Sequence, residues 1–219
     1  NTTGSLPTNY TIDNGIGNPI NVEIDPIEPF RVYLELGIPL SNGIEYILNV
    51  ENLKNQLDIV MNPQGFPFDF LIGAMIEPGD FVINEILADP LSGGGDYVEL
   101  YNNSDKFLDI ADLIISNTTR TSGRDKNVET SLVLKPGEYV VLTPEPFFTL
   151  LNYTVENPDF LIENSLPSYN ISDGNVSIFT SYGLDTVMID SFDYENDFHF
   201  PFIDDTKGIS LERINFDAP

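Results

Sequence analysis

The sequence has no cysteine, no tryptophan and one histidine, His199. Without cysteine, the chain has no disulfides, Cys-ligated zinc, iron–sulfur clusters or thiol catalysis. A single histidine excludes metal sites built from several histidines, and a Ser-His-Asp triad would depend on that one residue, which has no nucleophile-elbow sequence nearby. The remaining enzymatic route is a glycosidase-like pair of carboxylates. Among 35 acidic residues some pair always lies close, so proximity alone proves little.

Basic residues are also scarce: nine lysines and arginines face 35 acidic residues, which gives a net charge of −26. A field of that sign repels phosphate groups, so we expect no nucleic-acid partner and no binding to anionic membranes. A solvated acidic surface is the expected outcome, with dedicated cation binding as the alternative. The longest uncharged apolar run, residues 70–76, is far shorter than the about 18 residues of a membrane helix, so we expect no membrane span.

Long helical patterns are missing too, whereas 16 glycines and 16 prolines punctuate the chain. Residues 30–36 alternate strictly, with Phe30, Val32 and Leu34 on one predicted face, as in a half-buried strand. Lys135-Pro136-Gly137 predicts a type II hairpin turn, and a helical turn is expected around 147–151. The pattern predicts an all-β, antiparallel protein with the strand spacing of a β-sandwich.

The best boundary lies at Glu77-Pro78-Gly79-Asp80, because proline removes a ladder donor and glycine admits a sharp turn. We therefore predict two tandem β modules, residues 1–78 and 79–219. The chain begins at Asn1 without an initiator methionine or a signal peptide, so we expect a mature product or an excised segment of a longer protein.

Several motifs in the second module resemble the lamin-tail domain of the bacterial kind. The resemblance covers roughly residues 80–216 and implies an immunoglobulin-like β-sandwich. Its opening is carried by residues 83–86, Asp89-Pro90, 96–102 and Ser104-Asp105, its central hairpin by 134–142, and its final strands by 173–176, Tyr182-Gly183, Ile189-Asp190 and Tyr194.

Residues 1–78 resemble the second half of a small bacterial Ig-like module, so we expect this module to be partial. The matching positions are Asn9-Tyr10, Leu40, Gly43 and Tyr46, whereas residues 51–55 replace the module's usual Asp-x-x-Gly-Asn. Residues 208–214 resemble the end of lamin-tail domains in secreted bacterial multidomain proteins. The likeness implies an extracellular or cell-surface location and neighbouring domains in a parent chain. The chromatin role of nuclear lamins is not implied, because the chain has no coiled-coil rod and no basic patch.

Glu85 and Glu99 are the most informative acidic pair, since each lies in an apolar-flanked strand and antiparallel pairing would bring them together. They are edge or surface positions, members of a structural network with Asn84, Asn102 or Arg213, or a functional site. We favour the structural network. Arg213 is included because a strand-borne arginine among so many carboxylates is expected to have a partner.

Calcium is the one cofactor that the acidic loops suggest, although no EF-hand or nonapeptide spacing is present. The candidate ligands are Asp89, Asp96, Asp193 and Asp197, with Asp190, Glu195 and Asp204-Asp205 nearby in sequence. Residues 198–202, Phe-His-Phe-Pro-Phe, suggest either an aromatic platform or a strand edge or loop that fills the core. We favour the core, and the absence of tryptophan weakens a lectin interpretation.

The sequence therefore favours a non-catalytic structural, adhesion or spacer module of a larger exported bacterial protein, with protein or glycan partners. The alternative is a carbohydrate- or peptide-binding accessory module of a secreted enzyme. A small hydrolase that uses clustered acids is the third hypothesis.

Overall fold

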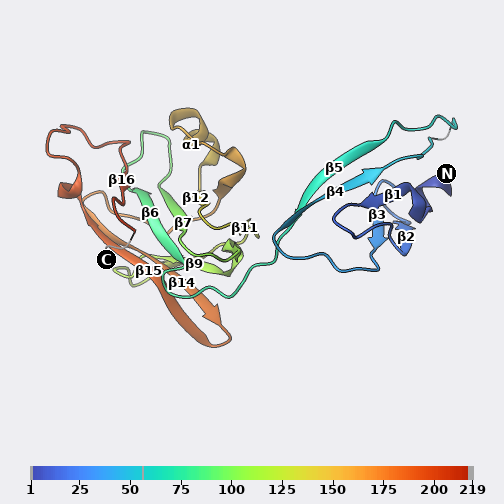
Figure 1. Cartoon of the computed structure of the whole chain (residues 1–219). Helices are drawn as coiled ribbons and strands as arrows, with labels where there is room; N and C mark the ends of the chain where they lie inside the picture. Colours follow the sequence, from blue (N-terminus) through green and yellow to red (C-terminus); the bar gives the residue numbers. More distant parts are fainter. Residues whose placement is uncertain (1, 56, 217–219) are drawn as a thin grey trace. The chain divides into compact units, whose positions relative to one another are not determined.

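The computed structural model describes residues 2–55 and 57–216, and the chain divides into two units, Asn1–Ile72 and Gly73–Pro219 (Figure 1). Strands dominate both units, so the predicted all-β class is confirmed. The assignment of residues 1–78 to a partial Ig-like module stays a prediction. None of the helices among the described residues is long and apolar enough to cross a membrane.

The first unit contains two small antiparallel sheets. One has the strand order β1-β4-β5 and the other pairs β2 with β3. The elements are η1 (Thr2–Ser5), η2 (Pro7–Asn9), β1 (Tyr10–Ile12), β2 (Asn21–Ile24), β3 (Val32–Glu35), β4 (Ile44–Val50) and β5 (Gln64–Phe70). The long β4–β5 hairpin is conspicuous in Figure 1. Pro67 lies in the middle of β5, opposite Ile47, and β5 is an outer strand of its sheet.

Alternating side chains form the core of this unit. In β4, Tyr46 and Val50 are buried on one face, and the Tyr46 ring stacks on Phe68 of β5 with centroids 5.7 Å apart. Val32 and Leu34 of β3 turn toward a second buried cluster, as their alternation predicts. Phe30 does not share that face, because it precedes β3 and is 83% exposed.

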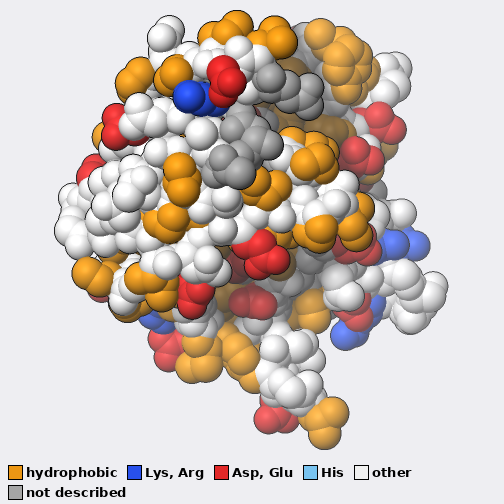
Figure 2. Space-filling view, turned by 90° about the vertical axis from the view of Figure 1, so that its right-hand side faces the viewer, with side chains coloured by type: hydrophobic (Ala, Val, Ile, Leu, Met, Phe, Trp, Pro, Cys, Tyr) orange, Lys and Arg blue, Asp and Glu red, His pale blue; other side chains and the backbone are white. Residues whose placement is uncertain are grey.

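Large hydrophobic side chains remain exposed in the first unit. Ile27, Phe30 and Leu57 are each more than three-quarters exposed. Figure 2 shows one face of the molecule, on which orange hydrophobic side chains are numerous between red acidic ones, and blue basic ones are few. Such apolar surface is typical of regions that contact another protein surface.

The second unit is a two-layered β-sandwich. One layer has the strand order β13-β12-β7-β6-β16, the other has the order β10-β9-β14-β15, and a short β8–β11 ladder accompanies them. The elements are β6 (Phe81–Leu87), β7 (Tyr97–Asn102), β8 (Leu108–Asp109), η3 (Ile110–Asp112), β9 (Leu113–Ser116), β10 (Asp125–Asn127), β11 (Val133–Leu134), β12 (Tyr139–Thr143), α1 (Pro146–Asn152), η4 (Pro158–Phe160), β13 (Leu161–Glu163), β14 (Asp173–Tyr182), β15 (Asp185–Glu195), η5 (Asn196–Phe198) and β16 (Leu211–Glu212).

One hydrophobic core fills the space between these layers. Alternate residues of β7 and β12, such as Val98, Leu100 and Val140, are fully buried against Val176 and Ile178 of β14. The pairings are antiparallel except that of β12 with β13, which is parallel. Parallel pairing is feasible here because a 17-residue connection from residue 144 to residue 160, containing α1, carries the chain back across the layer.

The predicted turn between β11 and β12 is present, and Gly137 has a φ of +80°. The turn does not close a hairpin, because β11 pairs with β8 whereas β12 pairs with β7 and β13. Gly137 donates its backbone N–H to the Asn102 carbonyl at 3.0 Å, which ties the turn to the end of β7. A Cβ at this position would meet only the Tyr101 hydroxyl at 3.9 Å, so the demand for glycine is conformational rather than steric.

We expect Gly137→Ala to lower the free energy of unfolding by about 1 kcal/mol, because alanine resists positive φ. Gly137→Asn is the matched control and should cost less, since asparagine tolerates the left-handed region. Urea denaturation of the three proteins measures both effects. Equal stability of the alanine variant and the parent would contradict this account of the turn.

Candidate binding groove

A register shift brings the predicted pair of glutamates together. Glu85 of β6 lies directly opposite Glu99 of β7, and the β-bulge between Ile83 and Glu85 leaves Asn84 without a cross-strand partner. The freed Asn84 side chain, which is 7% exposed, donates its amide to Glu99 Oε1 at 2.6 Å. The bulge therefore directs the Asn84 side chain so that it donates a hydrogen bond to the carboxylate of the neighbouring strand.

Glu85 is held by two hydroxyl groups. Its Oε1 accepts a hydrogen bond from the Tyr97 hydroxyl at 2.5 Å and another from the Ser210 hydroxyl. Tyr97 itself is buried. Burial, followed by the bond to Glu85, raises the pKa of the Tyr97 phenol, so it stays a proton donor to this carboxylate.

A third glutamate extends the pair across the sheet. Glu212 of β16 is the cross-strand partner of Glu85, so Glu212, Glu85 and Glu99 are opposite one another on three adjacent strands. We call these three residues the glutamate row. Burial raises the pKa of Glu99, the Asn84 bond opposes this, and the charges of Glu85, Glu212 and Glu156 raise the pKa further. The carboxylates thus repel one another.

The other two residues of the predicted network bond elsewhere. Arg213 donates Nε to the Ile83 carbonyl at 2.8 Å and Nη2 to Asp190 Oδ2 at 2.7 Å. Asp190 also accepts the Ile83 backbone N–H at 2.8 Å, so this ion pair joins β16 and β6 to β15 of the opposite layer. Asn102 is fully buried and donates to the carbonyls of Lys106 and Leu134.

A groove of about 740 Å³ contains the glutamate row. Its floor is the outer face of β6, β7 and β12, and the connection between β12 and β13 supplies one wall through Thr149 and residues 153–157. Five acidic residues line it: Glu85, Glu99, Glu138, Glu156 and Glu212. Four aromatic residues line it: Tyr97, Tyr139, Tyr153 and Phe160. Among the described residues that line it, none is basic.

The sequence pointed to the floor of this groove but missed its wall. Glu85 and Glu99 stood out because strand pairing predicts their contact. Tyr153, Glu156 and Ser210 gave no signal, because their approach depends on the path of two irregular connections.

The predicted calcium ligands do not converge. In the described part of the chain no three His, Cys, Asp or Glu side chains are grouped so that they could hold a metal ion. Asp89 lies 3.7 Å from Lys207 Nζ, Asp193 accepts from Asn175 at 2.8 Å, and Asp197 belongs to η5. Burial, and then the charge of Asp89, raise the pKa of Asp96 to about 6, against the bond from the Tyr169 backbone N–H.

The aromatic run at 198–202 does not fill the core, and this expectation was wrong. Phe198, Phe200 and Phe202 are each more than half exposed. β15 ends at Glu195, and beyond η5 the rings of Phe200 and Phe202 contact each other with centroids 5.4 Å apart.

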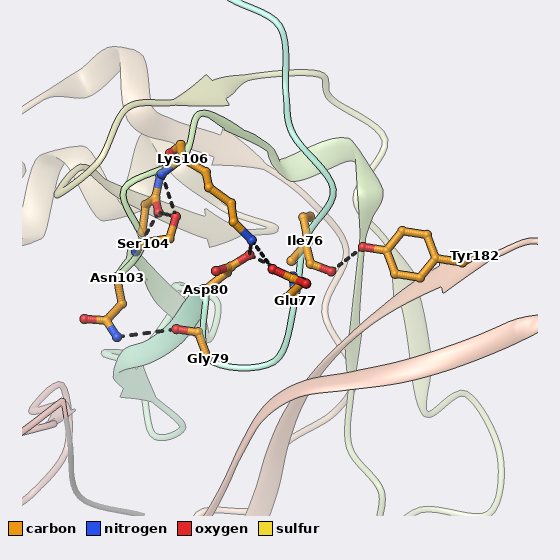
Figure 3. A network of polar contacts seen from close by, with 9 residues as sticks. Ile76, Glu77, Gly79, Asp80, Asn103, Ser104, Lys106 and Tyr182 are labelled. Atoms are coloured by element: carbon orange, nitrogen blue, oxygen red, sulfur yellow. Dashed lines mark hydrogen bonds and ion pairs between the residues drawn. The ribbon is translucent and has the colours of Figure 1, made fainter.

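A second polar cluster fixes the entry to β6 (Figure 3). Lys106 Nζ contacts Asp80 Oδ2 at 2.9 Å and also binds Glu77, while Asp80 accepts the Glu77 backbone N–H at 2.7 Å. The Tyr182 hydroxyl donates to the Ile76 carbonyl. These contacts raise the pKa of Lys106, so the lysine stays charged, and they attach the Pro78-Gly79 turn to the β7–β8 loop and the β14–β15 hairpin.

The family model for the Lamin Tail Domain matches residues 75–196, which is more than half of the chain. The comparisons with curated proteins and with solved structures each found no match. The matched residues include β6, β7 and the β12–β13 connection, and therefore most of the groove.

We expect Glu99→Ala to lower the free energy of unfolding by about 1–2 kcal/mol, because the buried Asn84 amide would lose its acceptor. Glu99→Gln keeps an acceptor oxygen and removes one charge of the glutamate row, so it should be as stable as the parent or more stable at pH 7. Thermal melts followed by circular dichroism measure both variants. An unchanged melting temperature for Glu99→Ala would refute the structural role of this residue.

We expect Asp96→Asn to stabilise the protein at pH 7 by on the order of 2 kcal/mol and to have little effect at pH 4. The folded pKa of about 6 exceeds the ordinary value of 3.8, so the folded state binds this proton more tightly than the unfolded state. Stability conferred by the proton is present below about pH 4 and is lost as the pH rises through 6. Denaturation at pH 4, 5, 6 and 7 tests the sign, and a stabilisation independent of pH would contradict it.

Proposed function

The chain belongs to the lamin tail domain family, and from that membership we propose that it serves as a non-catalytic structural, adhesion or spacer module of a larger exported bacterial surface protein. The family fold is an immunoglobulin-like β-sandwich, which is a scaffold and not by itself a catalyst. The proposed location is the cell surface or the extracellular space, with other domains of the parent chain as neighbours.

One observation carries the non-catalytic interpretation: the most prominent carboxylate pair is bonded into the sheet. Asn84 donates to one oxygen of Glu99, while Tyr97 and Ser210 donate to one oxygen of Glu85. A glycosidase needs one carboxylic acid that donates a proton and one carboxylate that is free to attack or to activate water. The engaged acceptors of this pair fit the task of holding β6, β7 and the segment before β16 in register.

The exposed apolar side chains of the first unit support a place within a larger assembly. Ile27, Phe30 and Leu57 each expose a hydrophobic side chain of the kind that an adjacent domain would bury.

The second candidate function is a carbohydrate- or peptide-binding accessory module, and the groove favours it. Tyrosine rings next to hydrogen-bonding groups suit either ligand class. A glycan array separates the two ligand classes, since a spacer or a peptide-binding module should give no saturable glycan signal.

We expect the purified chain to hydrolyse none of a panel of chromogenic glycosides, esters and phosphoesters above the rate of a heat-denatured sample. The matched control is Glu85→Gln/Glu99→Gln, which keeps both sites polar. Reproducible hydrolysis that disappears in the folded double variant would overturn the non-catalytic proposal.

The proposed location has its own test. Protease treatment of intact producing cells should remove the chain if it is displayed at the surface, or the chain should appear in the medium. Complete protection until the cells are lysed would contradict export.

A further inference from the structure

We propose that the groove on the outer face of β6, β7 and β12 binds a lysine- or arginine-rich extended segment of a partner protein. This inference deepens the peptide-binding candidate and rests on the non-catalytic interpretation of the glutamate row. It concerns the second unit alone, since every residue of the groove belongs to Gly73–Pro219.

The glutamate row is the first argument. Glu212, Glu85 and Glu99 are successive cross-strand partners, and neighbouring strands lie about 4.8 Å apart. Like charges in opposing positions destabilise a sheet, and sequences normally avoid them. No lysine or arginine is among the described residues lining the groove, so the compensation within this site is limited to hydrogen bonds. A cation supplied by a partner would remove this cost.

Buried side chains hold two carboxylates of the groove in fixed positions. Asn84 and Tyr97 are each more than nine-tenths buried and orient the carboxylates of Glu99 and Glu85. Glu156 lines the wall formed by the β12–β13 connection, and its charge contributes to raising the pKa of Glu99. Carboxylates from the floor and from the wall therefore line the same groove.

The uncharged residues that line the groove suit the apolar part of a lysine or arginine side chain. Val141 and Phe160 offer apolar surface for the methylene stem of lysine or arginine. Tyr139, which is 40% exposed, and Tyr153 also line the groove, and aromatic rings attract ammonium and guanidinium groups. Thr154 and Asn157 at the rim are able to bond a peptide backbone.

The dimensions indicate an extended segment. Alternate side chains of an extended peptide lie about 7 Å apart on one side, and the glutamate row spans about 10 Å over its three strands. Two basic residues separated by one position would both reach the row. A calcium ion fits less well, because the described residues include no group of three ligands arranged for a metal.

The test is the affinity of fluorescein-labelled hexalysine for the whole chain, measured by fluorescence anisotropy in 150 mM salt. The groove variant is Glu156→Gln/Glu212→Gln, which leaves the bonds of Glu85 and Glu99 intact. The matched control is Glu129→Gln/Glu195→Gln, which removes the same charge from two exposed residues outside the groove.

We expect the groove variant to weaken binding by about 10-fold and the control by less than about 2-fold. Equal weakening by both variants would show attraction by the net charge alone and would overturn the proposal. So would the absence of binding by the parent, equally tight binding of spermine, or full displacement of the peptide by 1 mM calcium at constant ionic strength. None of these results would by itself refute the non-catalytic function, which depends on the hydrolysis assays.

A second measurement distinguishes a binding site from a structural one. Glu212→Gln should raise the melting temperature of the free protein, because one charge of the row is removed, while it weakens hexalysine binding. A purely structural glutamate would lose stability on this substitution, and that result would also contradict the proposal.

Discussion

The antiparallel pairing of β6 with β7 is the interaction on which the second unit depends. It places Val98 and Leu100 in the core and sets Glu99 on the outer face, and a slip of one residue would exchange the two sets. The bulge at Asn84 allows Ile83 and Ile86 both to be buried although they are three residues apart. Register, core and groove are thus consequences of one local irregularity.

The ion pair between Arg213 and Asp190 complements that pairing by joining the two layers. Both side chains are mostly buried, and Asp190 also bonds the backbone of Ile83 just before the bulge. An ion pair in such surroundings offsets the cost of desolvation only when its remaining hydrogen bonds are made, as they are here by Ile83. In a chain with so few basic residues, this arginine serves packing between layers, whereas the outer face of the sheet is left acidic.

The sequence predicted much of the second unit, because its signals are local. Alternation predicted β6 and β7, and proline followed by glycine predicted the turn at 136–137. Strand pairing predicted that Glu85 and Glu99 lie close together, but their direct opposition depends on the bulge at Asn84, which the sequence did not reveal. The wall of the groove was not predictable, because Tyr153 and Glu156 reach it through a connection whose path is set by packing against β12 and β13. Phe30 and Phe200 were assigned to the interior from the alternation of apolar residues, yet both lie beyond the strands that would have carried them inward.

Pro67 in the edge strand β5 affects whether copies of the chain can pair through this edge. Asp13 accepts the Ile47 N–H with its side chain and donates its own backbone N–H to the Ile47 carbonyl. Both backbone groups of Ile47 therefore point away from β5, so Ile47 and Pro67 are a pair without hydrogen bonds between them. The backbone nitrogen of Pro67 consequently faces the open edge of the sheet. A strand that paired with this edge of β5 would have one carbonyl without a donor, because Pro67 has no backbone N–H. Pro67 therefore disfavours the addition of strands from other copies in an amyloid-like stack. The exposed isoleucines and phenylalanines of this unit would otherwise favour such stacking.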